Sequence, residues 1–183
     1  RPIVLDQFDG SYFQRTEAAQ EAGLTCAIAI PVFADNTLKA VLVVLCGNDA
    51  GHVGAIEVWE DRDDRLHLDA GYYGAAEDFG AASQDVVFAQ GEGLPGGVWS
   101  AQMPVLMRQI GSRHGFVRGE SAKAAGLRHG LGIPVQAPDG RTRIVTLLTG
   151  ADTPLARRFE IWDGRPERVG PRRAAVRIDG ICE

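Results

Sequence analysis

Alternating apolar and polar positions predict two strands joined by a tight turn in the middle of the chain. Val53–Glu60 is apolar and rich in residues that favour strands, and Arg65–Tyr73 has the same character after the polar turn Asp61–Asp64. This pattern is typical of a β-hairpin. The first strand is expected to present two different faces, with Ala55, Glu57 and Trp59 on one and Gly54, Ile56 and Val58 on the other.

Periodicity and turn residues also predict the elements that follow this hairpin. We expect a short helix over 75–82 and strands over 86–89, 129–135 and 143–148. The glycine-rich segment Gly91–Gly97 contains Pro95 and is predicted to be a loop. A second short helix over 120–125 should end at Gly126, because a residue without a Cβ suits the left-handed position after a helix. Pro138–Gly140 predicts the turn between the last two strands.

The chain repeats itself at a spacing of 103 residues. Phe13–Glu17 recurs as Phe116–Glu120, and Ile30-Pro31-Val32 recurs as Ile133-Pro134-Val135. Without any insertion, residues 13–47 share 13 identities with residues 116–150. Glu57-Val58-Trp59 then recurs as Glu160-Ile161-Trp162 in the same alignment. The repeat predicts two copies of one structural unit.

The order of the repeated segments predicts how the two units are built. We expect one continuous domain over residues 53–150 and a second domain formed by residues 1–48 together with 155–183. The two end segments correspond to complementary parts of the unit, and half a sheet alone would expose open strand edges. We therefore expect a circularly permuted second domain. Since the chain begins with Arg1 rather than Met, we also expect this domain to lack N-terminal residues. Exchange of segments between two copies of the chain is the alternative.

Several segments in the continuous unit resemble those of one known family. They are Gly91-Glu92-Gly93-Leu94-Pro95-Gly96-Gly97-Val98-Trp99, Pro104-Val105, Phe116-Val117-Arg118, Ala125-Gly126-Leu127 and Ile133-Pro134-Val135. In order and spacing they resemble the GAF domain family of small-molecule sensors, and the resemblance covers residues 53–150. It implies an α+β fold with a mixed or antiparallel sheet and flanking helices, here duplicated with the 103-residue period. The long signalling helices that usually flank such domains have no room between the two units, which only Asn48–His52 separate.

The resemblance also suggests where a ligand would bind. The candidate ligand-binding residues are Trp59, Gly93, Trp99, Met107, Phe116, Arg118 and His129. Aromatic side chains would form apolar walls, glycine would allow close backbone approach, and Arg118 would supply a fixed cation for an anionic group. In the alternative interpretation the aromatic residues fill the core and Arg118 forms an internal salt bridge. The protein would then be a dimerisation or scaffold module without a ligand.

Cysteine and histidine positions bear on metal and redox chemistry. The three cysteines include no CxxC pair and no Cys/His cluster at zinc spacing, so we expect no metal and no cofactor. Cys26 and Cys46 flank a strand pair that turns near Asp35-Asn36, and we expect them to face each other as reduced thiols. A thiol-based redox sensor or reductase that uses this pair is the alternative function. Free methionine-(R)-sulfoxide reductases are GAF enzymes with nearby catalytic cysteines that have no counterpart here, so we expect no enzyme activity and no catalytic residues.

Composition narrows the remaining function classes. The 183 residues carry 19 Lys and Arg against 24 Asp and Glu, a net charge of -5, without a dense basic patch. This balance argues against a nucleic-acid surface. No run of eighteen apolar residues and no signal peptide is present, so we expect a cytoplasmic protein without a membrane partner. We therefore predict a regulatory protein that binds a small-molecule metabolite, with a homodimer as a possible assembly.

Overall fold

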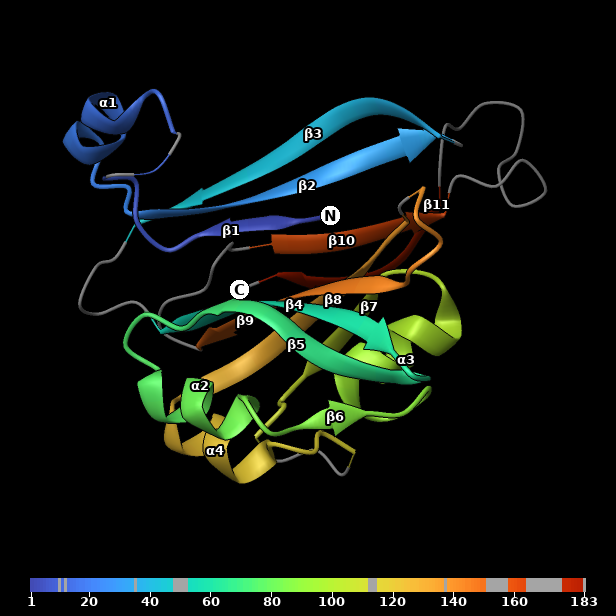
Figure 1. The fold of residues 1–183 in the computed structure, drawn as a ribbon. Helices are drawn as coiled ribbons and strands as arrows, with labels where there is room; N and C mark the ends of the chain where they lie inside the picture. Colours follow the sequence, from blue (N-terminus) through green and yellow to red (C-terminus); the bar gives the residue numbers. More distant parts are fainter. Residues whose placement is uncertain are drawn as a thin grey trace.

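The computed structural model describes residues 1–9, 11, 13–34, 36–47, 53–111, 115–136, 138–150, 158–163 and 176–182. These residues form three layers (Figure 1). Helices cover one face of a central six-stranded sheet, and a three-stranded sheet from the N-terminal segment covers the other face. The fold is therefore α+β.

The central sheet has the strand order β6-β5-β4-β9-β8-β7. Its strands are β4 (Gly54–Arg62), β5 (Arg65–Tyr72), β6 (Val87–Phe88), β7 (Val105–Arg108), β8 (Leu127–Val135) and β9 (Arg143–Gly150). Every strand pairing among the described residues is antiparallel. The predicted hairpin is confirmed as β4 and β5, and Asp63 and Asp64 close it with φ of 54° and 58°. Two positive φ values in a two-residue loop match the turn that suits twisted strands.

Three helices pack on one face of this sheet: α2 (Glu77–Ser83), α3 (Gly93–Ala101) and α4 (Gly119–Ala124). The predicted loop over Gly91–Gly97 is wrong, because α3 begins at Gly93. Pro95 lies in the first turn, where its missing N–H does no harm. Burial of Leu94 and Val98, both 0% exposed, outweighs the low helix propensity of the glycines. The stop at Gly126 is confirmed, since its φ is 72°.

The two faces of β4 separate as expected from the alternation. Ala55 and Trp59 belong to the inner core, which lies between the sheet and the helices. Phe79 of α2, Val98 of α3 and Ala122 of α4 complete this core from the helix side. Ile56 and Val58 point to the outer face and belong to a separate apolar cluster.

The outer face is covered by the N-terminal sheet β1-β2-β3. It consists of β1 (Ile3–Leu5), β2 (Cys26–Ala34) and β3 (Thr37–Cys46), with α1 (Thr16–Glu21) between β1 and β2. Ile28 and Ile30 of β2 pack against Ile56, Val58 and Val145 of the central sheet. Both faces of the central sheet are therefore buried, which explains why all eight residues of β9 are buried.

Strand registers follow the 103-residue spacing. Cys26 pairs with Cys46 as His129 pairs with Thr149, and Ile28 pairs with Val44 as Leu131 pairs with Leu147. The hairpin of β10 (Arg158–Asp163) and β11 (Val176–Cys182) shifts register between Ile161 and Trp162, as β4 and β5 do between Val58 and Trp59. Among the described strands, β10 and β11 pair only with each other. The division of the chain into two domains stays a prediction.

Candidate functional site

A polar cluster lies inside the inner core, between the central sheet and the helices. Its centre is the carboxylate of Glu57, which is 0% exposed although its strand neighbours on this face are apolar. Thr146 of β9 donates a hydrogen bond to Glu57 Oε2 at 2.9 Å, and Trp59 Nε1 donates to the same oxygen at 3.1 Å. Tyr73 donates to Oε1 at 3.3 Å. A buried carboxylate is stable only when its oxygens are paired in this way.

Arg118 supplies the positive charge of the cluster. Its two terminal nitrogens donate to the two oxygens of Glu57, with Nη2 and Oε2 2.9 Å apart. Nη1 also donates to Ser83 Oγ, and that hydroxyl donates to the carbonyl of Phe79 at 2.7 Å. The fork of the guanidinium thus matches the carboxylate in a bidentate pair. Arg118 precedes α4 and Ser83 ends α2, so both helices are tied to the sheet through one cation.

Aromatic rings surround the guanidinium of Arg118. Its Cζ lies 4.5 Å from the ring centroid of Phe79, 5.1 Å from Trp59, 5.5 Å from Phe116 and 5.6 Å from Phe88. Cations are attracted to the faces of such rings, most strongly where water is excluded. The Nε of Arg118 is the exception in this arrangement, since it is buried and finds no hydrogen-bond partner among the described residues.

The phenol of Tyr73 remains a hydrogen-bond donor in this environment. Burial raises its pKa well above the ordinary value, and the negative charge of Glu57 raises it further. Both effects disfavour a second anion next to the carboxylate. Tyr73 therefore stays a neutral donor beside the carboxylate of Glu57 at neutral pH.

The structure brings three of the predicted ligand-binding residues together. The guanidinium of Arg118 contacts the rings of both Trp59 and Phe116 at the polar cluster. Trp99 and Met107 are partly buried at the margin of the same core. Gly93 has a φ of 60°, and a Cβ there would lie 2.8 Å from the ring of Phe88.

His129 lies on the other face of the sheet. A Cβ on Gly130 would point at Leu94 and Leu148 of the inner core, while Leu131 packs against the outer cluster. His129 is two residues from Leu131 in the same strand, so alternation places it on the outer face. The structure therefore does not bring His129 next to Arg118. Whether any of the seven predicted residues binds a ligand stays a prediction.

Sequence reasoning missed several members of the cluster. Phe79 and Ser83, which contact Arg118, and Tyr73 and Thr146, which donate to Glu57, were not predicted. The available signal was Glu57 itself, because a carboxylate on the apolar face of a strand needs a buried cation. Thr146 lies directly opposite Glu57 in the register of β4 and β9, but that register becomes visible only when the strands are paired.

The two cysteines of the N-terminal sheet confirm the expected pairing. Cys26 and Cys46 are Cα partners on β2 and β3, and both are free thiols. The pairing of β2 with β3 shifts by one residue between Val32 and Phe33, so the two cysteines are not placed symmetrically about the turn of this hairpin. They lie in the sheet that covers the outer face, away from the Arg118 cluster.

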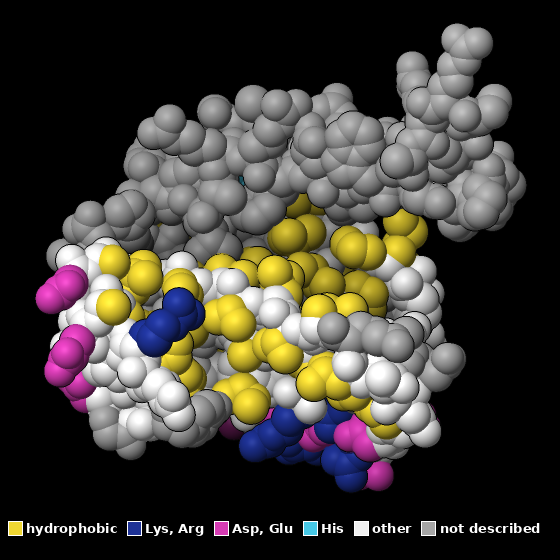
Figure 2. Space-filling view, turned by 90° about the horizontal axis from the view of Figure 1, so that it is seen from above, with side chains coloured by type: hydrophobic (Ala, Val, Ile, Leu, Met, Phe, Trp, Pro, Cys, Tyr) yellow, Lys and Arg dark blue, Asp and Glu magenta, His cyan; other side chains and the backbone are white. Residues whose placement is uncertain are grey.

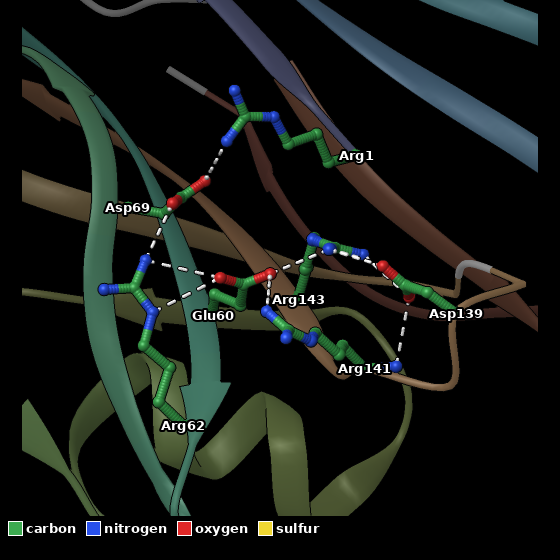
Figure 3. A network of polar contacts seen from close by, with 7 residues as sticks. All are labelled: Arg1, Glu60, Arg62, Asp69, Asp139, Arg141 and Arg143. Carbon is green, nitrogen blue, oxygen red and sulfur yellow. Dashed lines mark hydrogen bonds and ion pairs between the residues drawn. The ribbon is translucent and has the colours of Figure 1, made fainter.

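A second polar network lies at the end of the central sheet (Figure 3). Glu60 of β4 accepts from Arg143 at 2.7 Å, and Arg143 also donates to Asp139 at 2.6 Å. Arg62 bridges Glu60 and Asp69, at 3.3 Å and 2.9 Å. Through the hydrogen bonds of Arg143 to Glu60 and Asp139, the network ties the loop before β9 to the end of β4, although the Nε of Arg143 is buried without a partner among the described residues.

The charges of this network shift its pKa values. Hydrogen bonding from Arg143 lowers the pKa of Asp139 to about 2. Burial acts to raise the pKa of Glu60, but Arg143, Arg62 and Arg141 outweigh it, so the pKa falls below its ordinary value. The hydrogen bond to Asp139 in turn raises the pKa of Arg143. Glu60, Asp139 and Arg143 are therefore ionised at neutral pH.

Comparison with known proteins gives distant matches of fold only. No family model and no curated protein matches the sequence. The nlh2 GAF domain of A. aeolicus in an inactive state is 16% identical, with a TM-score of 0.43 over 54% of this chain and 58% of that chain. The GAF domain/HD domain protein from Geobacter sulfurreducens is 14% identical, with a TM-score of 0.44 over 55% and 65%. Free methionine-R-sulfoxide reductase from Neisseria meningitidis, in complex with its substrate, is 15% identical, with a TM-score of 0.37 over 52% and 51%. This chain thus spans less than two thirds of each of these three proteins.

The described residues contain neither a membrane-spanning helix nor a cluster of metal ligands. None of their helices is long and apolar enough to cross a membrane. No group of three or more His, Cys, Asp or Glu side chains in that part of the chain is placed to hold a metal ion.

Proposed function

We propose that this protein is a GAF-like regulatory domain that binds a small molecule beside Arg118 without transforming it. One observation carries the proposal: the Nε of Arg118 is buried and has no partner among the described residues, while both terminal nitrogens are bound. One of the sequence segments that resemble GAF sensors, Phe116-Val117-Arg118, contains this residue and leads into α4.

The unpartnered donor defines the chemistry of the ligand. A buried N–H without an acceptor costs about 1–3 kcal/mol, so an oxygen that reaches it would be bound favourably. Phe79, Phe88 and Trp59 offer apolar ring faces around that donor. The expected ligand is a small molecule with a carboxylate or carbonyl oxygen and an apolar body. Because these rings are at most 1% exposed, the ligand requires α2 or α4 to move outward.

A second candidate function is an interaction module, and a different surface supports it. β3 forms the edge of its sheet and carries several exposed apolar side chains: Leu38, Val41, Leu42 and Val43, each between 47% and 52% exposed. Hydrophobic side chains gather over a broad part of the described surface in Figure 2. Apolar patches of this kind mark contact surfaces in soluble proteins.

Thermal-shift screening with small carboxylic acids and amides tests the ligand site. A compound at a hundred times its dissociation constant should stabilise the wild-type protein by about 2.7 kcal/mol. Arg118→Lys keeps the charge but removes Nε, and should weaken binding at least tenfold. Arg15→Lys is the matched control, because Arg15 occupies the same position in the other repeat and is exposed.

Native mass spectrometry of gently purified protein supplies a second measurement that does not depend on the screen. A small molecule that co-purifies with wild type and with Arg15→Lys, but not with Arg118→Lys, supports the proposal. A wild-type protein without any bound compound or thermal shift, yet dimeric through β3, would replace it with the interaction module.

A further inference from the structure

Two thiols meet at the end of the N-terminal sheet. Cys26 is the first residue of β2 and Cys46 the last residue of β3, and the two are directly opposed in the strand register. Opposed residues of antiparallel strands have Cα atoms about 4.5–5.5 Å apart. This separation falls within the range of Cα distances that a disulfide spans.

The two thiols differ in exposure. Cys26 is 0% exposed, whereas Cys46 is partly exposed. A soluble oxidant can therefore reach Cys46 but not Cys26. Cys46 also packs against the outer face of the central sheet, in the same cluster as Tyr72 of β5.

The two thiols also differ in pKa. The thiol of Cys26 donates to the sulfur of Cys46, and this bond lowers the pKa of Cys46. The same bond, together with burial, raises the pKa of Cys26. The exposed sulfur is thus the one with thiolate character, and the thiolate is the reactive form of cysteine.

We propose that Cys46 and Cys26 form a peroxide-responsive thiol pair, in which Cys46 is the attacking residue and Cys26 the resolving residue. The Cys46 thiolate attacks the terminal oxygen of a hydroperoxide, the O–O bond breaks, and the alcohol or water leaves after taking up a proton. Cys46 is then a sulfenic acid. The Cys26 sulfur attacks it, the S–O bond breaks, and water leaves with the Cys26 proton. Two thiols are oxidised by two electrons and one hydroperoxide is reduced.

The position of the pair gives the oxidation a structural consequence. A bond between Cys26 and Cys46 locks the open end of the β2–β3 hairpin at its contact with Tyr72. The equivalent positions in the other repeat are His129 and Thr149, so the chemistry belongs to the N-terminal sheet alone. This proposal is independent of the ligand site at Arg118.

Reaction of the reduced protein with equimolar hydrogen peroxide tests the pair. Before oxidation, thiol titration in denaturant should count three free thiols. Afterwards, intact mass should fall by the two hydrogens lost, and peptide mapping should find Cys26 linked to Cys46. Cys46 should react faster in the folded protein than in urea, because the lowered pKa of Cys46 increases its thiolate fraction.

Three variants separate the roles. Cys26→Ser should stop at the sulfenic acid of Cys46, which a dimedone probe traps. Cys46→Ser should abolish the fast reaction, and Cys182→Ser should leave it unchanged. Circular dichroism establishes that each variant is folded, and Cys46→Ala replaces Cys46→Ser if the latter is not. Equal rates in folded and unfolded protein, or a disulfide that involves Cys182, would overturn the proposal.

Discussion

Arg118 is the residue whose side chain organises the inner core. It holds Glu57 from β4, touches four aromatic rings and binds Ser83 at the end of α2. Removing one partner from a buried ion pair leaves an unpaired charge, which costs about 3–5 kcal/mol. Replacing both partners of the pair by apolar residues lowers the free energy of unfolding much less.

This asymmetry gives the first prediction. Arg118→Met should lower the free energy of unfolding by about 3–5 kcal/mol, and Glu57→Leu combined with Arg118→Met should recover a large part of the loss. Urea unfolding of the single and double variants measures the coupling. Arg15→Met is the control and should stay within about 0.5 kcal/mol of wild type. Additive losses in the double variant would contradict a coupled pair.

Asp139 gives a prediction about acid stability. Its pKa is about 2 in the folded protein against an ordinary value of 3.8, so it stabilises the fold above about pH 4. That contribution is lost as the pH falls toward 2, because the unfolded chain takes up the proton first. Asp139 is half exposed, so the effect is below about 1 kcal/mol.

Chemical unfolding of Asp139→Asn from pH 6 to pH 2 checks this dependence. The variant should be less stable than wild type near pH 6, and the difference should shrink below pH 4. Asp85→Asn, at an exposed carboxylate outside the network, should show no such trend. A difference that grows toward low pH would mean that the sign is wrong.

Arg118 and Glu57 could be singled out from the sequence, but the ion pair between them could not. Arg118 and Glu57 each stand out in the sequence, one as a candidate cation and the other as an acid on an apolar face. They are separated by 61 positions. Nothing local couples them, because their contact depends on how α4 is placed over the sheet.

Among the elements, α3 shows most clearly where local signals fail. Three glycines and a proline predict a loop, yet the segment is helical because it covers the sheet with Leu94 and Val98. Tertiary burial of this kind overrides weak local propensity. The β4–β5 and β8–β9 hairpins, in contrast, were predictable because alternation and turn residues agree with the final packing.

Two neighbouring glycines of α3 should respond in opposite ways to alanine. A Cβ on Gly96 would lie 2.1 Å from the carbonyl oxygen of Ala89, whereas a Cβ on Gly97 meets nothing within 4 Å. Gly96→Ala should therefore destabilise the protein by about 1–3 kcal/mol. Gly97→Ala should stabilise it by up to about 1 kcal/mol, because alanine favours the helix. Thermal unfolding of the two variants measures both effects, and equal effects would contradict the packing of α3 against Ala89.

At the scale of the whole molecule, the repeat predicts a contact that joins the ends of the chain. In the central sheet Glu57 of β4 lies opposite Thr146 of β9. In the 103-residue repeat, Glu57 corresponds to Glu160 of β10 and Thr146 corresponds to Val43 of β3. Both strands have a free edge among the described residues, since β3 pairs with β2 and β10 with β11. The predicted second domain therefore requires β10 to pair with β3.

Cysteine cross-linking tests this arrangement. Val43→Cys with Glu160→Cys, in a protein whose native cysteines are replaced by alanine, should form a disulfide within one chain. Val43→Cys with Ile161→Cys is the control, because alternation turns residue 161 to the other face. A cross-linked dimer would favour exchange between two copies, and equal cross-linking of both pairs would contradict the register.

The packing of the N-terminal sheet on the central sheet was beyond sequence reasoning. The repeat indicates two similar units but says nothing about which faces meet. No sequence pattern around Ile28 and Ile30 indicates that they pack against Ile56 and Val58. The contact between the two sheets depends on the shape of their facing surfaces and on the apolar area buried between them.

That contact also determines how the protein can be divided. Residues 1–47 shield the apolar outer face of a sheet whose other face is already covered by helices. Cutting the chain before β4 would leave Ile56, Val58 and Val145 in water, at about 25 cal/mol for each square ångström uncovered. We expect a chain that begins at residue 53 to aggregate during purification, whereas the full chain stays in solution, as gel filtration of both would show. The segment that resembles one whole sensor domain thus depends for its solubility on the part of the chain that precedes it.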